Sequence, residues 1–178
     1  MAYPEFHRDI VKALTKGKFL LRSTHGKLFL SIYDKKEWYE EFFKETFDFQ
    51  LIVKNEYTYL FSEQSSESTS RDICVFIAVL SLELDKEEDK GNIDDIKYRY
   101  FTFDMIFRIL EDSPFKRNFE NQTACYKDLS SFLKTLNTRN IIQYTERDSD
   151  KFRFTKAIDV FFDFARHVAK ERLQEEVN

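Results

Sequence analysis

The chain has 178 residues, of which 42% are hydrophobic and 34% are charged, which is typical of a folded protein and argues against disorder. Its formal net charge of −4 argues against an autonomous, basic nucleic-acid binder. With only three Gly and two Pro it is also a poor candidate for a β-sandwich or a Rossmann-like sheet, and its twenty Phe and nine Tyr predict an aromatic core.

The first sixty residues alternate between helical and extended patterns. A helix is expected from Pro4, a good first-turn residue, to Gly17, which suits a helix end. A short strand over 18–22 follows, and then a second helix for which Thr24 is the expected cap. This order of elements is the start of a small α+β domain.

A third predicted helix begins at an Asp34–Glu37 pair that resembles a capping box. It carries an aromatic stripe that consists of Trp38, Tyr39, Phe42 and Phe43. We interpret this stripe as part of the core, and the alternative is an interface with a partner. Alternating residues over 47–53 and 57–61, joined by a turn at Asn55-Glu56, then predict a β-hairpin.

The polar stretch SEQSSESTS, residues 62–70, is the one low-complexity segment. It predicts a linker at 63–70 between a first domain over 1–62 and a second domain over 71–178. The second domain opens with a helix over 71–84 that is apolar on nearly all sides, which predicts burial between neighbours.

The segment from Glu83 to Asp95 contains seven acidic residues and two lysines, so we expect an exposed loop there, or a contact for a basic partner. A short strand over 98–101 precedes a helix capped by Thr102 and ended by Ser113-Pro114. The apolar stripe expected on this helix contains Phe103, Ile106, Phe107 and Leu110.

The stretch from Tyr126 to Phe154 has the pattern of a winged helix. Helical spacing of apolar residues predicts one amphipathic helix through Tyr126, Leu129, Phe132, Leu133 and Leu136. A charged hairpin follows, with Ile142 and Tyr144 on one face of its first strand and Phe152 and Phe154 on one face of its second. A final amphipathic helix is expected over 158–169.

The same order of helices and hairpin therefore occurs twice in the chain. We predict an α+β, mainly α fold: tandem winged-helix domains with a C-terminal helix.

Catalytic and cofactor-binding motifs are missing from the sequence. His7, His25 and His167 lack metal-ligand spacing, no glycine-rich phosphate loop is present, and Cys74 and Cys125 have no CxxC partner. We therefore expect no enzyme activity, no metal and no cofactor, with a small-molecule or metal enzyme using one of these histidines as the remote alternative. The cysteines suit a reducing cytoplasm, and the longest apolar run, Ile73 to Leu84, is too short to cross a bilayer.

Two groups of residues are candidate binding sites. Phosphate contacts to DNA are predicted for a basic group on the second winged helix, with an ordinary solvated face as the alternative because acidic residues dilute it; the group is Lys127, Lys134, Arg139, Arg147, Lys151 and Arg153. A dimer contact or a partner groove is predicted for the C-terminal helix at Phe161, Phe162 and Phe164.

Three stretches resemble the MukE and MksE group of proteins. They are DSDKFRFTKAIDVFFDFA from Asp148 to Ala165, WYEEFF from Trp38 to Phe43, and LSSFLKTLNTRNIIQY from Leu129 to Tyr144. Members of this group are kite proteins, the kleisin-interacting tandem winged-helix subunits of bacterial SMC complexes, and the subunit of a plasmid-defence system belongs to the same broad group.

The resemblance implies a non-enzymatic, homodimeric, cytoplasmic and nucleoid-associated protein. Its partners would be a kleisin subunit, an SMC ATPase and, within the complex, DNA, and its role would be chromosome condensation and segregation or plasmid defence. The family's DNA contacts carry over to Lys151 and Arg153 in the matched KFR motif. The alternative is a stand-alone winged-helix regulator of transcription or replication.

Overall fold

The computed structural model describes residues 3–62, 68–87, 95–121, 123–146, 148 and 150–164. The chain divides into two compact units, which are Met1–Ser66 with Thr138–Ile141, and Glu67–Asn137 with Ile142–Asn178. The domain limits 1–62 and 71–178 stay a prediction. Of the predicted linker, residues 68–70 form the first turn of a helix, and residues 63–67 lie outside the described part of the chain.

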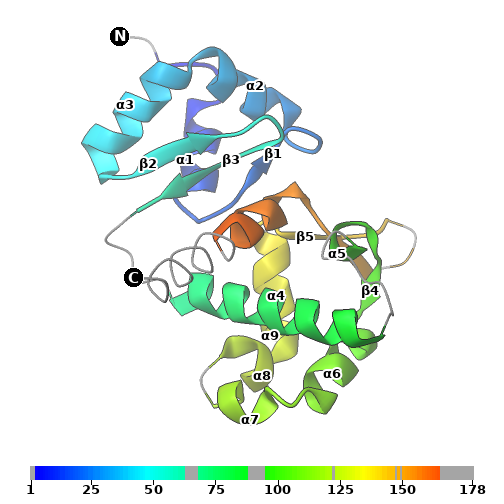
Figure 1. The fold of residues 1–178 in the computed structure, drawn as a ribbon. Coiled ribbons are helices and arrows are strands. Elements are labelled where there is room, and N and C mark those ends of the chain that lie inside the picture. Colours follow the sequence, from blue (N-terminus) through cyan, green and yellow to red (C-terminus); the bar gives the residue numbers. More distant parts are fainter. Residues whose placement is uncertain are drawn as a thin grey trace, which may run out of the picture. The chain divides into compact units, whose positions relative to one another are not determined.

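The first unit contains three helices and a three-stranded antiparallel sheet (Figure 1). The strand order is β1-β3-β2, so the first strand pairs with the last strand of the hairpin. This is the winged-helix arrangement. Its elements in chain order are α1 (His7–Leu14), β1 (Leu20–Leu21), α2 (Gly26–Asp34), α3 (Lys36–Phe47), β2 (Gln50–Val53) and β3 (Tyr57–Phe61).

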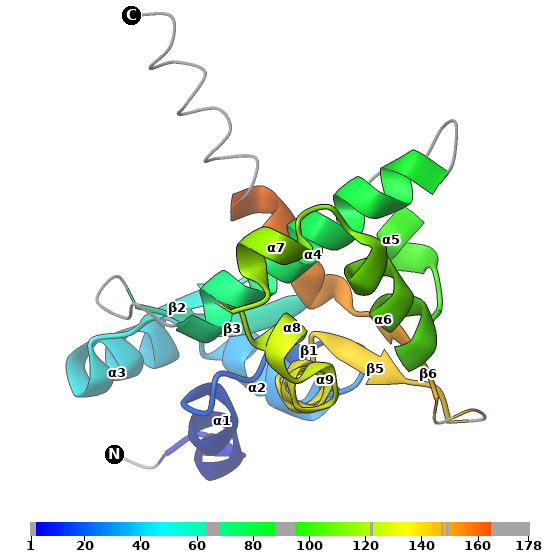
Figure 2. The ribbon, with the colours of Figure 1, turned by 90° about the horizontal axis from the view of Figure 1, so that it is seen from below.

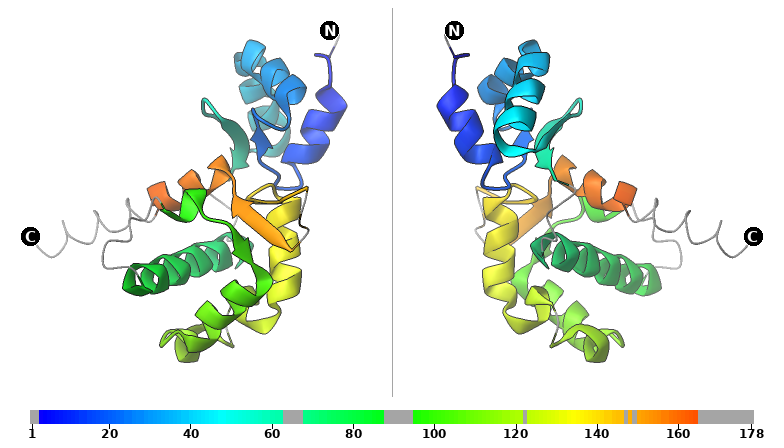
Figure 3. Two further views of the ribbon diagram at one scale, coloured as in Figure 1. Left: turned by 90° about the vertical axis from the view of Figure 1, so that its right-hand side faces the viewer. Right: turned by 90° about the vertical axis from the view of Figure 1, so that its left-hand side faces the viewer.

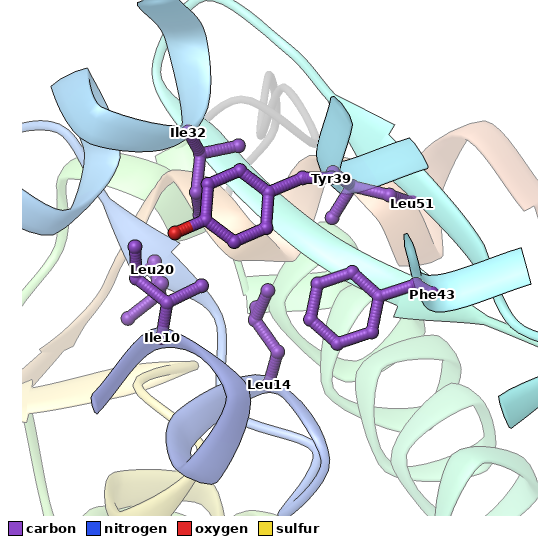
Figure 4. Packing of buried hydrophobic residues seen from close by; sticks show 7 residues of the cluster. All are labelled: Ile10, Leu14, Leu20, Ile32, Tyr39, Phe43 and Leu51. Atoms are coloured by element: carbon purple, nitrogen blue, oxygen red, sulfur yellow. The ribbon is translucent and has the colours of Figure 1, made fainter. Parts of the chain in front are cut away.

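One buried cluster holds the first unit together (Figure 4). Tyr39 and Phe43 of α3 are fully buried in it, which confirms them as core, whereas Trp38 and Phe42 are half-buried beside the cluster. Each of the three helices and two of the strands contribute to the cluster, which is why they pack as one body. Its members are Ile10, Leu14, Leu20, Ile32, Tyr39, Phe43 and Leu51.

Three helix starts in the first unit differ from the prediction. The expected Thr24 cap is wrong, since His25 precedes α2 and no side chain caps that helix. α1 begins at His7 and not at Pro4, because Phe6 adopts a left-handed conformation with φ 61°. The predicted capping box at Asp34 is wrong: Asp34 is the last residue of α2, and Lys35 precedes α3 without a side-chain capping bond. The hairpin is confirmed, with the Lys54 N–H donating to the Tyr57 carbonyl at 2.9 Å across the turn. Its first strand begins at Gln50 and not at residue 47, because Phe47 ends α3 and Asp48 is left-handed.

The second unit repeats the plan with extra short helices. Its antiparallel sheet has the order β4-β6-β5, which matches the order in the first unit. The elements are α4 (Ser68–Glu87), α5 (Asp95–Tyr98), β4 (Phe101–Thr102), α6 (Phe103–Asp112), α7 (Lys116–Phe119), α8 (Ala124–Lys127), α9 (Leu129–Thr138), β5 (Ile142–Tyr144), β6 (Lys151–Phe154) and a 3-10 helix (Lys156–Ile158).

Aromatic rings connect the elements of the second unit. Phe76 of α4 meets Phe132 of α9 edge-on at 5.2 Å, and Phe101 of β4 lies 5.6 Å from Phe154 of β6. Phe152 and Phe154 are buried on the same side of β6, as the alternation predicted. Within this unit α9 therefore lies beside the β5–β6 hairpin (Figures 2 and 3).

Three boundaries in the second unit correct the prediction. Residues 83–87, expected in an acidic loop, are the last turn of α4, and residues 88–94 lie outside the described chain. The strand expected over 98–101 is reduced to β4, since Tyr98 ends α5. The single helix expected from Tyr126 is two helices, because Asp128, with φ −153° and ψ 87°, is not helical between α8 and α9.

The predicted start and end of α6 are confirmed. The Thr102 hydroxyl accepts from the Met105 N–H at 3.2 Å, and α6 stops at Asp112 before Ser113-Pro114. The apolar stripe of this helix is buried along one edge only. Ile106 and Leu110 are buried, but Phe103 and Phe107 are 41% and 47% exposed, because α6 packs through one edge of the apolar stripe only.

After the 3-10 helix, residues 159–164 are helical, and residues 165–178 lie outside the described part. The mainly helical α+β fold with tandem winged helices is confirmed. None of the helices within the described ranges is long and apolar enough to span a membrane.

Candidate nucleic-acid interface and partner surface

The exposed face of α9 carries little charge. Asp128 caps this helix, because its Oδ1 accepts from the Ser131 N–H at 3.0 Å, and that hydrogen bond lowers the pKa of the Asp128 carboxyl. The apolar side of α9 is buried, which leaves the other side to solvent; its exposed residues are Ser130, Ser131, Lys134, Asn137 and Thr138. Lys134 is thus the one charge on a surface of small polar groups.

The turn of the second hairpin is closed by hydrogen bonds around Thr145 and Asp148. The Thr145 N–H donates to the Lys151 carbonyl at 2.8 Å, and its hydroxyl donates to the Asp148 carbonyl at 2.6 Å. The Lys151 N–H donates in turn to the Asp148 carbonyl at 3.1 Å. These bonds fix the direction of β6 and hence of the side chains that it presents to solvent.

Lys151 and Arg153 lie on the solvent side of β6, opposite the buried Phe152 and Phe154. The Lys151 Nζ is 3.0 Å from Asp148 Oδ2. This ammonium, and then the Asp150 N–H, lowers the pKa of the Asp148 carboxyl. Arg153 faces Gln143, a neutral residue, across the hairpin.

The six basic residues predicted to contact DNA do not all belong to one surface. Lys127, Lys134, Lys151 and Arg153 are exposed residues of the second unit. Arg139 lies in the segment Thr138–Ile141, which groups with the first unit, and its carbonyl accepts from the Phe19 N–H at 2.9 Å. Arg147 lies outside the described residues.

The corresponding helix of the first unit has the opposite character. The exposed surface of α3 is rich in carboxylates, with Glu37, Glu41 and Glu45 against Lys36 and Lys44. A DNA phosphate would meet repulsion there, whereas α9 presents no carboxylate beyond its cap. The two winged helices share a fold, and the exposed helix of the second carries fewer carboxylates than that of the first.

The three phenylalanines predicted to bind a partner have different environments. Phe161 and Phe162 are only 8% and 6% exposed, whereas Phe164 is 56% exposed. The Phe162 ring lies 5.4 Å from Lys97 Nζ, and Lys97 also pairs with Asp159 at 2.7 Å. Phe161 and Phe162 therefore fix the C-terminal segment to its own unit, and Phe164 is the ring available to a partner.

The family model for the condensin complex protein MksE matches residues 5–166. The chain belongs to the MksE family. The match spans both winged helices and the start of the C-terminal helical segment, and it confirms the resemblance seen in the sequence. Membership makes the chain a subunit type of SMC-like complexes, and MksE-family subunits are structural and non-catalytic. No curated protein matches the chain.

The histidines of this MksE-family chain do not assemble a reactive site in the described structure. His7 stacks on Tyr3 at 4.5 Å and lies edge-on to Trp38 and Phe42, and burial lowers the pKa of its imidazole. His25 accepts from the Leu21 N–H at its Nδ1, and His167 is outside the described residues. Among the residues described, no cluster of His, Cys, Asp or Glu could hold a metal ion.

Aromatic residues on α6 and in the segment just before it are exposed, which the sequence did not indicate. Phe103 and Phe107 stack at 6.1 Å, and Tyr98 and Tyr100 are 73% and 49% exposed nearby in the chain. The helical spacing of Phe103 and Phe107 is equally typical of a buried stripe, so spacing alone does not reveal this surface. Only the packing of α6 through Ile106 and Leu110 shows that these rings face outward.

Proposed function

We propose that this MksE-family chain is a non-enzymatic accessory subunit of a bacterial SMC–kleisin complex. It binds the kleisin subunit and helps hold DNA against the SMC ATPase, in chromosome condensation and segregation or in plasmid defence. The family match over residues 5–166 carries the proposal. ATP hydrolysis belongs to the SMC partner, and the chain acts as a homodimer in the cytoplasm, at the nucleoid.

DNA contact in this proposal is made by the second winged helix. Lys127 and Lys134 lie on its exposed helical surface, and Lys151 and Arg153 lie on its wing. These few cations contribute phosphate contacts and no base reading, so they position DNA and carry no sequence preference. The net charge of −4 fits a subunit whose DNA binding is shared with partners.

Phe164 belongs to the proposed partner surface of the C-terminal segment. Its ring is more than half exposed, while Phe161 and Phe162 hold the segment in place. An exposed ring on a firmly packed support loses little side-chain entropy on binding, which favours its use as an anchor for the kleisin or for a second copy.

A mobility-shift assay with a salt titration tests the proposal against a stand-alone regulator. We expect the chain alone to bind duplex DNA weakly and without sequence preference, and the complex with its kleisin-type and SMC-type partners to bind it well. A regulator would bind one sequence tightly by itself, with a log–log salt slope of about −0.9 for each phosphate contact. That result would replace the proposed function.

A further inference from the structure

A groove opens on the first winged helix between the end of α3 and the start of β2. Its volume is about 530 Å³, and every residue that lines it belongs to the first unit. The lining combines apolar and acidic side chains: Glu40, Glu41, Lys44, Asp48, Phe49, Gln50, Leu51, Phe61 and Ser62. The proposed DNA contacts, which lie on the second unit, do not use it.

The groove lies at the start of the outer strand of the first sheet, whose residues Gln50 and Leu51 line it. The order β1-β3-β2 places β2 at the edge. The Lys54–Tyr57 bond closes the turn, and antiparallel strands alternate, so Ile52 turns its backbone polar groups toward β3 while Leu51 turns them away. The Thr58 hydroxyl donates to the Ile52 carbonyl at 2.8 Å, which agrees with that alternation. Leu51 lines the groove, so its outward backbone groups border it.

The side chains of the groove suit a positively charged guest. Glu40, Glu41 and Asp48 outnumber Lys44, for a net charge of −2 from these four residues. The Phe61 ring is 44% exposed and Phe49 is half-buried, which gives the groove an apolar floor. A guanidinium or ammonium group interacts favourably with carboxylates and with the faces of aromatic rings. Glu40 also pairs with Lys36 at 3.5 Å, but this exposed ion pair is weak, so Glu40 can bind a cation of the guest instead.

We propose that this groove receives an extended, positively charged segment of a partner protein. The segment adds to the edge of β2 through its backbone and places an arginine or lysine side chain against Glu40 and Glu41. Backbone pairing supplies affinity, and the groove supplies the preference for a basic side chain. The assignment of this segment to the kleisin rests on the proposed function. The expectation that the segment is extended and basic rests on the groove alone.

Two short fluorescent peptides test the groove with the full chain. One alternates arginine and valine, and the other alternates glutamate and valine. We expect the first to bind and the second not to bind. Glu41→Lys should weaken binding about tenfold, while Glu37→Lys, the same charge change on the first turn of α3, should leave it within about twofold. Equal binding of both peptides, or equal losses in both variants, would overturn the inference.

Hydrogen exchange of the full chain with a purified kleisin-type subunit identifies the partner. We expect the amides of Leu51 and Val53, whose N–H groups point away from β3, to gain protection on binding. If the kleisin-type subunit binds and these amides stay unprotected, the inference fails and the proposed function stands. If it does not bind while the arginine peptide still does, the proposed function fails and the groove belongs to another basic partner.

Discussion

Gly17 shows how a single residue determines the path of the chain after α1. Its φ of +71° lies in the left-handed region, and a Cβ there would stand 3.3 Å from Cζ of Arg139. We expect Gly17→Ala to lower the free energy of unfolding by about 1 kcal/mol, because alanine strains in this conformation. Urea denaturation measures the loss.

Gly26 provides the matched control for that substitution. It is the first residue of α2 and has open space around its Cα. Gly26→Ala should be neutral or slightly stabilising, since alanine favours helix. An equal decrease in the free energy of unfolding for both substitutions would show that the left-handed conformation of Gly17 does not affect stability.

His7 makes the first unit sensitive to acid. Burial lowers its pKa below the ordinary value near 6.5, so the unfolded chain takes up the proton first as pH falls. The free energy of unfolding is therefore highest above about pH 7, and it declines as the pH falls through about 6.5 toward the lowered pKa of His7. His25 shifts in the same direction, so His7→Phe should remove only part of the decline. Thermal unfolding across this range measures it, and an unchanged pH profile in His7→Phe would contradict the account.

At the scale of elements, α8 depends on one buried carboxylate. Asp72 of α4 is 7% exposed, and its Oδ2 accepts at 3.0 Å from the N–H of Ala124, the first residue of α8. Asp72→Ala leaves that N–H without its partner and should cost about 1–3 kcal/mol of stability. Chemical denaturation tests this, with the exposed Asp112→Ala as a control that should change stability by less than about 0.5 kcal/mol. Matching losses would rule out the capping role.

The wing is the element whose charge should matter for DNA. Reversing both wing cations, by Lys151→Glu with Arg153→Glu, should weaken DNA binding by the assembled complex about tenfold while leaving the fold intact by circular dichroism. The matched control is Lys35→Glu with Lys36→Glu, which makes the same charge change at the start of the acidic α3. We expect little effect from the control. Unchanged DNA affinity in the wing variant would refute the wing assignment.

The sequence predicted elements best where the pattern and the packing coincide. Both hairpins were found because alternation over short runs has one structural meaning, as for Phe152 and Phe154. The break at Asp128 was not found, because the helical spacing of Tyr126, Leu129 and Leu133 continues across it. Aspartate is a favoured N-cap, and its bond to the Ser131 N–H marks the start of α9. The exposure of Phe103 depends on which edge of α6 its neighbours cover, and the groove beside β2 depends on pairs distant in sequence; neither can be derived from local spacing.

For the whole molecule, one plan is used twice with different surfaces. Both sheets place the first strand against the last, yet α3 is acidic and α9 is nearly uncharged. Two small cores of this size need extensive aromatic packing, which twenty Phe provide. In the proposed account, one unit binds a basic protein segment and the other contacts a DNA phosphate backbone. This division of surfaces is expected of a subunit that joins partners and does not turn over a substrate.

Co-expression with the kleisin-type and SMC-type subunits of the same complex tests that claim most directly. Size-exclusion chromatography with light scattering would give the mass of the species that contains this chain. The account predicts that the chain elutes with the kleisin-type subunit in a stable assembly. Elution of the chain by itself, at its own mass, in the presence of both partners would contradict it.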